Sequence, residues 1–164
     1  MRTLRLTDDA AMPALGLGTW KSAPGEVGAA VREAIRLGYR HIDCAPIYGN
    51  EQEVGAALAA AVAAGEVTRD ELWITSKLWN DRHAEADVVP ALRQTLADLG
   101  LERLDLFLVH WPVALKKGRV MPDGAGDFVS LDELPLEETW RGMEAALEAG
   151  LTRTIGVSNC SVKK

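Results

Sequence analysis

Residues 87–112 read DVVPALRQTLADLGLERLDLFLVHWP, a helical pattern followed by an apolar strand. Apolar side chains recur at helical spacing over residues 87–99, and Gly100 is a typical helix end. Residues 104–109 then form a nearly continuous apolar run, which is typical of a strand buried in a parallel sheet. The segment therefore predicts a helix and then a strand, with His110 directly after the strand.

The same alternation of patterns runs along most of the chain. It predicts helices over 25–38, 50–64, 87–99 and 137–149, and strands over 41–43, 72–76, 104–109 and 154–157. Before them, residues 3–7 and 12–17 read as a β-hairpin that leads into a strand, with Asp8 and Asp9 at its turn. Strands that alternate with helices predict an α/β fold with parallel βαβ units.

Two α/β architectures fit this order, a closed barrel and an open doubly wound sheet. The open sheet usually carries G-x-G-x-x-G after its first strand, but here Gly16-Leu17-Gly18 is followed by Thr19, Trp20 and Lys21. We therefore expect the (β/α)8 TIM-barrel type. Such a barrel typically needs about 250 residues. We accordingly expect residues 1–164 to form a single partial barrel domain, with the hairpin, about five strands and four helices.

Composition limits the partners and the compartment. The formal net charge is −6 and Lys and Arg form no cluster, so we expect no nucleic-acid partner and no anionic membrane surface. The start of the chain lacks the apolar core of a signal peptide, and the alanine-rich run 56–64 is shorter than the ~20 residues of a spanning helix. Cys44 and Cys160 supply no disulfide framework, which indicates a reducing, cytoplasmic location.

Chemically distinctive side chains follow the predicted strands. They lie in DCAPIYGNE from Asp43, SKLWN around Lys77, LVHWP around His110 and GVSN ending at Asn159. The carboxyl ends of barrel strands meet at one mouth, where they hold the active site. A carboxylate, a phenol, an ammonium and an imidazole at that mouth can move a proton at an oxygen while hydride moves at the adjoining carbon. The motifs therefore predict a carbonyl reductase.

The four side chains have complementary roles in such chemistry. A phenol is a weak acid at neutral pH, and a nearby cation such as Lys77 favours its ionised form, which suits Tyr48 as the general acid. A lysine inside a barrel needs a carboxylate to stay charged, and Asp43 can supply it. His110 can donate a hydrogen bond to the substrate carbonyl. Each residue taken alone also has a plain structural reading, as a loop aromatic, an ion pair or a core histidine.

At these motifs the chain resembles the aldo-keto reductase family, NADPH-dependent enzymes built on a (β/α)8 barrel. The resemblance extends from GLGTW at Gly16 to GVSN and covers roughly the first half of a family member. It implies that Asp43, Tyr48, Lys77 and His110 form the catalytic tetrad, and that Ser158 and Asn159 hold the nicotinamide carboxamide. It also implies that the cofactor, NADPH or NADP, meets Gly18, Thr19 and Trp20.

The resemblance leaves three functions open. The first is the N-terminal portion of an enzyme that reduces small aldehydes or ketones. The second is a non-catalytic binding or auxiliary subunit, or an inactive fragment, because family members grip the rest of the cofactor with residues beyond the fifth strand. The third is a metal-dependent hydrolase or lyase. Five strands would leave two sheet edges open, so we expect possible self-association of residues 1–164.

Other side chains near the strand ends need separate interpretation. Trp20, Trp79 and Trp111 are expected to line an apolar substrate pocket, whereas Trp73 and Trp140 are expected to pack. His41, Asp43 and Cys44 lie close in sequence, but no H-x-H or H-E-x-x-H pattern occurs, so we expect no metal site.

Three further interpretations concern a helix start, a loop and a thiol. Asn50-Glu51 reads as a helix cap, and the stretch 112–135 reads as a functional cover over the barrel mouth. Cys160 reads as a buried thiol.

Overall fold

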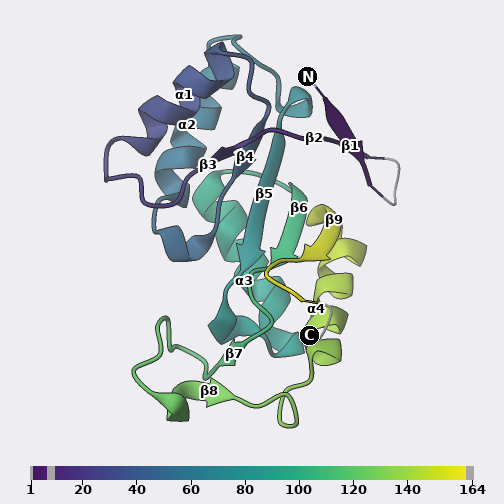
Figure 1. The fold of residues 1–164 in the computed structure, drawn as a ribbon. Helices are drawn as coiled ribbons and strands as arrows, with labels where there is room; N and C mark the ends of the chain where they lie inside the picture. Colours follow the sequence, from purple (N-terminus) through teal and green to yellow (C-terminus); the bar gives the residue numbers. More distant parts are fainter. Residues whose placement is uncertain (1, 7–9, 162–164) are drawn as a thin grey trace.

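The computed structural model describes residues 2–6 and 10–161. Its centre is a five-stranded parallel sheet in the order β3-β4-β5-β6-β9 (Figure 1). The strands are β3 Leu17–Gly18, β4 His41–Asp43, β5 Trp73–Leu78, β6 Leu104–Val109 and β9 Thr152–Val157. Neighbouring strands follow one another in the chain through helical or loop connections, which is the order of the first strands of a barrel.

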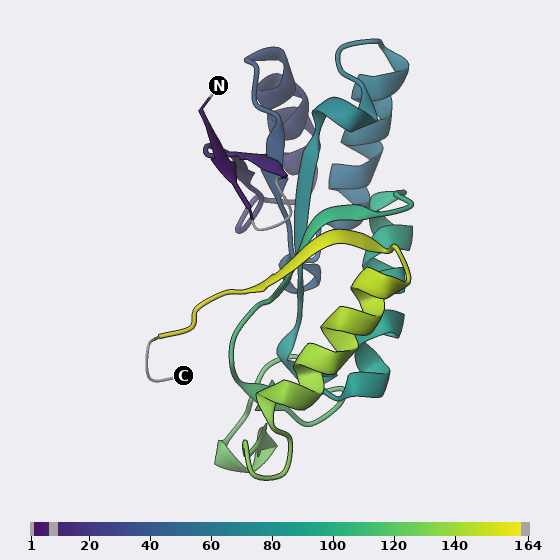
Figure 2. The same cartoon turned by 90° about the vertical axis from the view of Figure 1, so that its right-hand side faces the viewer.

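The helices cover one face of this sheet. They are α1 Val27–Arg36, α2 Glu51–Ala63, α3 Glu85–Leu99 and α4 Leu136–Glu148. Figure 2 shows helices on one side of the sheet, with the N-terminal hairpin and the C-terminal segment on the other. The buried core joins apolar side chains of every helix to the outward side chains of the strands, among them Val31, Leu58, Leu92, Met143, Ile42, Ile74 and Phe107. The predicted helices are confirmed, with bounds shifted by at most two residues.

The predicted hairpin is confirmed, but the strand 12–17 is not continuous. β1 Thr3–Arg5 and β2 Ala11–Pro13 pair antiparallel, and the turn expected at Asp8 and Asp9 lies outside the described residues. The chain then leaves the hairpin and starts β3 in the main sheet. A Cβ at Gly16 would lie 2.9 Å from the ring of His41, so the close approach to β4 depends on that glycine.

Two strands extend beyond their predicted ends. β5 continues through Leu78, because Lys77 and Leu78 still pair with Leu108 and Val109 of β6. Lys77 therefore lies inside the strand rather than after it, since a charged side chain that points into the site does not break the ladder. β9 begins two residues earlier than expected, at Thr152.

The connection from β6 to α4 is more ordered than its sequence suggests. It contains the short antiparallel pair β7 Ala114–Leu115 and β8 Phe128–Val129, which sequence patterning missed. The connection lies at the carboxyl ends of the sheet strands (Figure 1). Trp79 donates its indole N–H to the carbonyl oxygen of Val120 at 2.7 Å, and Lys117 pairs with Asp87. The segment is thereby attached to the chain around the end of β5.

Candidate active site

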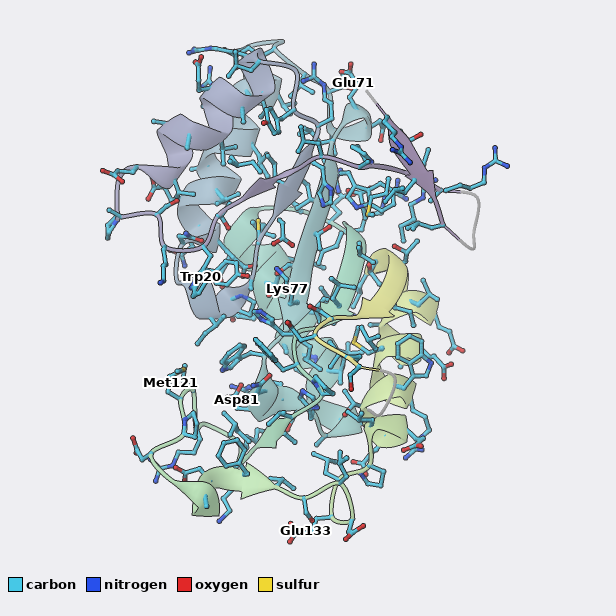
Figure 3. All side chains as sticks on the ribbon, viewed as in Figure 1. Trp20, Glu71, Lys77, Asp81, Met121 and Glu133 are labelled. Carbon is cyan, nitrogen blue, oxygen red and sulfur yellow. The ribbon has the colours of Figure 1, made fainter. Side chains whose placement is uncertain are left out.

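The sheet brings the four predicted catalytic residues to one edge. Asp43 is the last residue of β4, and Tyr48 ends the short 3-10 helix η1 (Pro46–Tyr48) that follows. Lys77 lies near the end of the central strand β5, and His110 directly follows β6. Because the strands are parallel, their carboxyl ends lie at the same edge, and Figure 3 shows Lys77 toward that end of β5.

The Lys77 ammonium is the hub of the site. Its Nζ lies 2.8 and 2.9 Å from the two carboxylate oxygens of Asp43, 2.7 Å from the carbonyl oxygen of Cys44, and 3.3 Å from Tyr48 Oη. An ammonium has three N–H donors, and these partners surround it. The Lys77 side chain is only 7% exposed, so the Asp43 carboxylate compensates a charge that water does not reach. Tyr48 is thereby held next to a fixed positive charge.

His110 lies among aromatic rings at the same edge. Its ring centroid is 5.9 Å from that of Tyr48, 5.0 Å from that of Trp79 and 6.3 Å from that of Trp111. Burial, and then the charge of Lys77, lowers the pKa of His110 to about 4. The imidazole is therefore neutral at pH 7, with one N–H available to donate. Its Nδ1 is buried and has no hydrogen-bond partner.

The end of β9 reaches His110 through Asn159. Asn159 Nδ2 donates to the carbonyl oxygen of His110 at 2.8 Å and to Ser158 Oγ at 2.9 Å. The Ser158 backbone N–H donates to the carbonyl oxygen of Val109, which continues the pairing of β9 with β6. A hydroxyl beside an amide offers both donors and acceptors, the combination that a nicotinamide carboxamide requires. The donor set therefore fits the predicted cofactor group.

The predicted cofactor residues at and after the end of β3 lie next to tetrad residues. Gly18 pairs with Asp43 in the sheet. Thr19 is fully buried, and both its backbone N–H and its hydroxyl donate to the carbonyl oxygen of Asp43, at 3.1 and 3.0 Å. Trp20 is 66% exposed, and its ring centroid is 6.4 Å from that of Tyr48. Figure 3 shows Trp20 at the outer margin of the site.

The five tryptophans lie in three kinds of place: beside a cavity, next to Tyr48 and in the packed interior. Trp79 and Trp111 line an apolar cavity of about 220 Å³ with side chains of the connection 112–129. Trp20 lies apart from this cavity, next to Tyr48. Trp73 is buried inside β5, and Trp140 packs against the core from α4 while its indole N–H donates to Glu144.

The side chains around β4 were a candidate for a metal site, and the His41 ring is engaged in other contacts. The ring nitrogens of His41 lie 3.1 Å from the carbonyl oxygen of Pro13 and 2.9 Å from Thr75 Oγ1. Among residues 2–6 and 10–161, no group of three or more His, Cys, Asp or Glu side chains is placed to hold a metal ion. In the same residues, no helix is both long and apolar enough to cross a membrane.

Sequence and fold comparisons identify relatives of this chain. A sequence model of the aldo/keto reductase family matches residues 14–164. The chain belongs to the aldo/keto reductase family. It is 52% identical over all its 164 residues to aldo/keto reductase slr0942 of Synechocystis sp., covering 50% of that protein. It is 54% identical over 90% of its length to human aldo-keto reductase family 1 member A1, covering 46% of it.

Solved structures of aldo/keto reductases share the fold. The aldose reductase of Schistosoma japonicum superposes with a TM-score of 0.93 at 42% identity, over 99% of this chain and 55% of that one. The aldo-keto reductase of Bombyx mori in complex with NADP gives 0.82 at 43% identity, over 94% of this chain and 49% of that one. The fold is thus of the TIM-barrel type, as predicted. The chain spans about half the length of the curated relatives it matches.

Two interpretations of single residues are wrong in this aldo/keto reductase. Asn50 occupies the N-cap position of α2 but makes no side-chain cap; its amide instead donates to the carbonyl oxygen of Thr19 at 2.8 Å. Cys160 is exposed rather than buried, because it lies beyond the end of β9.

Sequence reasoning also missed Glu51. This residue is buried at the start of α2, and Ser76 Oγ donates to its Oε1 at 2.6 Å. A signal was present, because Glu51 stands three and seven residues before Val54 and Leu58, on the apolar face of the helix. An acidic residue in the first helical turn is usually read as a partner of the helix dipole, and that reading hid its burial.

Proposed function

We propose that this chain carries the catalytic tetrad of an NADPH-dependent oxidoreductase that reduces small aldehydes or ketones to alcohols. One observation carries the proposal: the buried Lys77 ammonium contacts the carboxylate of Asp43 and the hydroxyl of Tyr48 at the same time. A purely structural ion pair would not need a phenol at the mouth of the barrel. The matching family and the NADP complex of the Bombyx mori relative support the same activity and cofactor.

The residues divide the reaction between them. When bound, the reduced nicotinamide supplies the hydride for the carbonyl carbon. Tyr48 donates its proton to the carbonyl oxygen, and the Lys77 charge 3.3 Å from Oη stabilises the phenolate that remains. Asp43 keeps Lys77 charged during this step. Neutral His110 donates a hydrogen bond that orients the carbonyl oxygen toward Tyr48.

Cofactor and substrate would meet different parts of the site. Ser158 and Asn159 would hold the nicotinamide carboxamide, and Gly18, Thr19 and Trp20 would border the same space. The apolar cavity beside Trp79 and Trp111 favours an apolar carbonyl substrate. We also infer that residues 1–164 form one structural unit of the barrel, since a single core cluster joins all the helices to the sheet.

Isotope transfer tests the proposal on the intact protein. NADPH carrying deuterium at the transferable position of the nicotinamide is incubated with a panel of aliphatic and aromatic aldehydes and ketones. We expect deuterium at the alcohol carbon of at least one product. The Tyr48→Phe variant should lose about 100-fold or more of this rate while cofactor affinity stays nearly unchanged, because only the proton donor is removed. Tight NADPH binding without any transfer would instead indicate a non-catalytic relative.

A further inference from the structure

Glu51 is a buried carboxyl that the mechanism above does not use. It is the first residue of α2 and is 4% exposed. Ser76 Oγ donates to its Oε1 at 2.6 Å, while its Oε2 is buried with no hydrogen-bond partner. A buried carboxylate oxygen without a partner is destabilising, so an apolar side chain at this place would give a more stable fold.

The Glu51 carboxyl lies on the helix side of the sheet, next to the strand that carries Lys77. Ser76 and Lys77 are consecutive in β5, so their side chains point to opposite faces of the sheet. Glu51 therefore holds β5 from the helix side at the position next to Lys77. Cys44, whose carbonyl oxygen accepts from Lys77, lies close by, since the charge of Glu51 adds to burial in raising the pKa of the Cys44 thiol.

The Glu51 carboxyl changes its charge near neutral pH. Burial raises the pKa of Glu51 to about 7, while the hydrogen bond from Ser76 opposes the rise. The other charged groups that face it are Asp98 of α3, which raises this pKa, and Lys77 of β5, which lowers it. The Cys44 thiol, directly after β4, also faces Glu51, since the charge of Glu51 adds to burial in raising the pKa of that thiol.

We propose that Glu51 is a positioning residue for the Lys77–Tyr48 pair, which it supports through Ser76 and whose proton transfer it opposes when it is ionised. The inference rests on the proposed function, in which Tyr48 is the general acid. Lys77 and Asp43 form a neutral pair at the site. An ionised Glu51 adds an unbalanced negative charge next to that pair and opposes the charge that develops on Tyr48. A protonated Glu51 leaves the full effect of Lys77 on the phenol.

The charge of Glu51 determines how the rate of proton transfer depends on pH. Below pH 7 Glu51 is protonated and adds no charge to the site, whereas above pH 7 its carboxylate opposes the negative charge that develops on Tyr48 during proton transfer. Replacing Glu51 by Gln keeps the shape and the acceptor for Ser76 but removes the charge. We expect the single-turnover rate of Glu51→Gln relative to the parent to rise by about two- to tenfold between pH 6 and pH 8. A merely structural role of Glu51 would change the rate by the same factor at every pH.

Two further variants of the intact protein complete the experiment. Glu53→Gln removes a carboxylate from the same helical turn, but Glu53 is bound to the backbone N–H groups of Gly25 and Gly28, so its rate ratio should not vary with pH. Ser76→Ala keeps the Glu51 carboxyl and removes a hydrogen bond that favours its charged form. The midpoint of the pH effect should therefore move above 7, and this arm remains available if Glu51→Gln does not fold.

The outcomes separate this inference from the proposed function. A flat ratio for Glu51→Gln, or an unmoved midpoint in Ser76→Ala, overturns the role of Glu51. If Tyr48→Phe transfers hydride at the parent rate, the proposed function itself is wrong. A Tyr48→Phe variant without activity, together with a flat Glu51→Gln ratio, contradicts only the inference about Glu51.

Discussion

Asn159 donates a hydrogen bond from its side-chain amide to the backbone carbonyl oxygen of His110 at 2.8 Å. The bond links the chain just after β9 to the chain just after β6, at the edge where the tetrad lies. Asn159 has a φ of 58°, a left-handed conformation that asparagine adopts more readily than most residues. One side chain thus fixes both its own turn and the backbone that carries the imidazole.

The first prediction separates these two contributions. Asn159→Ala removes the hydrogen bond to His110. It also leaves, at a left-handed φ, a side chain that cannot form local hydrogen bonds to offset the strain. The variant should therefore lower the free energy of unfolding by about 1 to 3 kcal/mol. Asn159→Gly loses the bond but accepts the conformation and should be less destabilised than the alanine variant. Urea unfolding of both variants provides the measurement. Equal losses would show that the left-handed backbone is not strained in the alanine variant.

The second prediction concerns the hub of the site. Lys77→Met leaves Asp43 partly buried without its cation and leaves Tyr48 without a neighbouring positive charge. We expect a loss of about 100-fold or more in kcat, with a smaller change in KM, and destabilisation on the order of 3 kcal/mol. Steady-state kinetics across pH and thermal melting provide the two readouts. An unchanged pH–rate profile would show that Lys77 and Tyr48 are not coupled.

Much of the fold could be predicted because periodicity reports burial. The helical stripes and the apolar run of β6 identified the layers, and parallel topology alone implied that Asp43, Lys77 and His110 would meet at one edge. The strands β7 and β8 were not predicted, because a strand of two residues is too short to show an alternating pattern of apolar and polar side chains. The paired residues, Ala114 with Val129 and Leu115 with Phe128, are far apart in the sequence, so only tertiary contacts define the pairing.

The sequence predicted which residues form the site, but not the hydrogen bonds between them. Residue type and position identified Tyr48 and Lys77, but the third acceptor of the ammonium is the backbone carbonyl oxygen of Cys44, which no side-chain pattern reveals. Thr19 was expected near the cofactor, yet its hydroxyl is used on Asp43. Such bonds depend on where backbone groups lie after folding, and a sequence pattern carries no information on that placement.

The third prediction is a pH dependence of stability that arises from His83. This side chain is 1% exposed, its Nε2 has no hydrogen-bond partner, and burial lowers its pKa from 6.5 to about 4. The unfolded chain takes up the proton first as pH falls, so stability is full above pH 6.5 and is lost as pH falls toward 4. His83→Phe removes this titration and keeps an apolar ring in the site.

The comparison of His83→Phe with the parent isolates the effect of that one group. The free energy of unfolding of the variant relative to the parent should increase by about 2 to 4 kcal/mol as pH falls from 6.5 to 4. Above pH 7 the difference should be constant and report packing alone. A difference that stays constant over the whole range would mean that His83 gains its proton in the folded protein as easily as in the unfolded chain.

The fourth prediction concerns the connection 112–135, which we expect to cover the substrate. Its tip is attached by the indole N–H of Trp79 and by the Lys117–Asp87 ion pair, both near the barrel mouth. Shortening the segment between Lys116 and Asp127 should change KM for carbonyl substrates on the order of tenfold, with little loss of melting temperature. Lys117→Ala is the control, since an exposed ion pair contributes about 0 to 1 kcal/mol. An unchanged substrate profile with a large drop in melting temperature would identify a packing element.

The last prediction concerns residues 1–164 expressed as a separate polypeptide. β3 and β9 are the outer strands of the sheet in the described part of the chain, and Val157 of β9 is 54% exposed. An outer strand offers backbone donors and acceptors to another chain, and the tetrad edge supplies contacts to only part of a dinucleotide. We therefore expect this polypeptide to self-associate and to bind NADPH weakly or not at all. Val157→Lys places a charge on the outer strand and should shift the population toward monomer. Light scattering gives the mass, and tryptophan fluorescence during NADPH titration gives the affinity.

Micromolar binding of NADPH by a compact monomer of residues 1–164 would contradict both expectations. It would show that this five-stranded sheet alone completes a cofactor site.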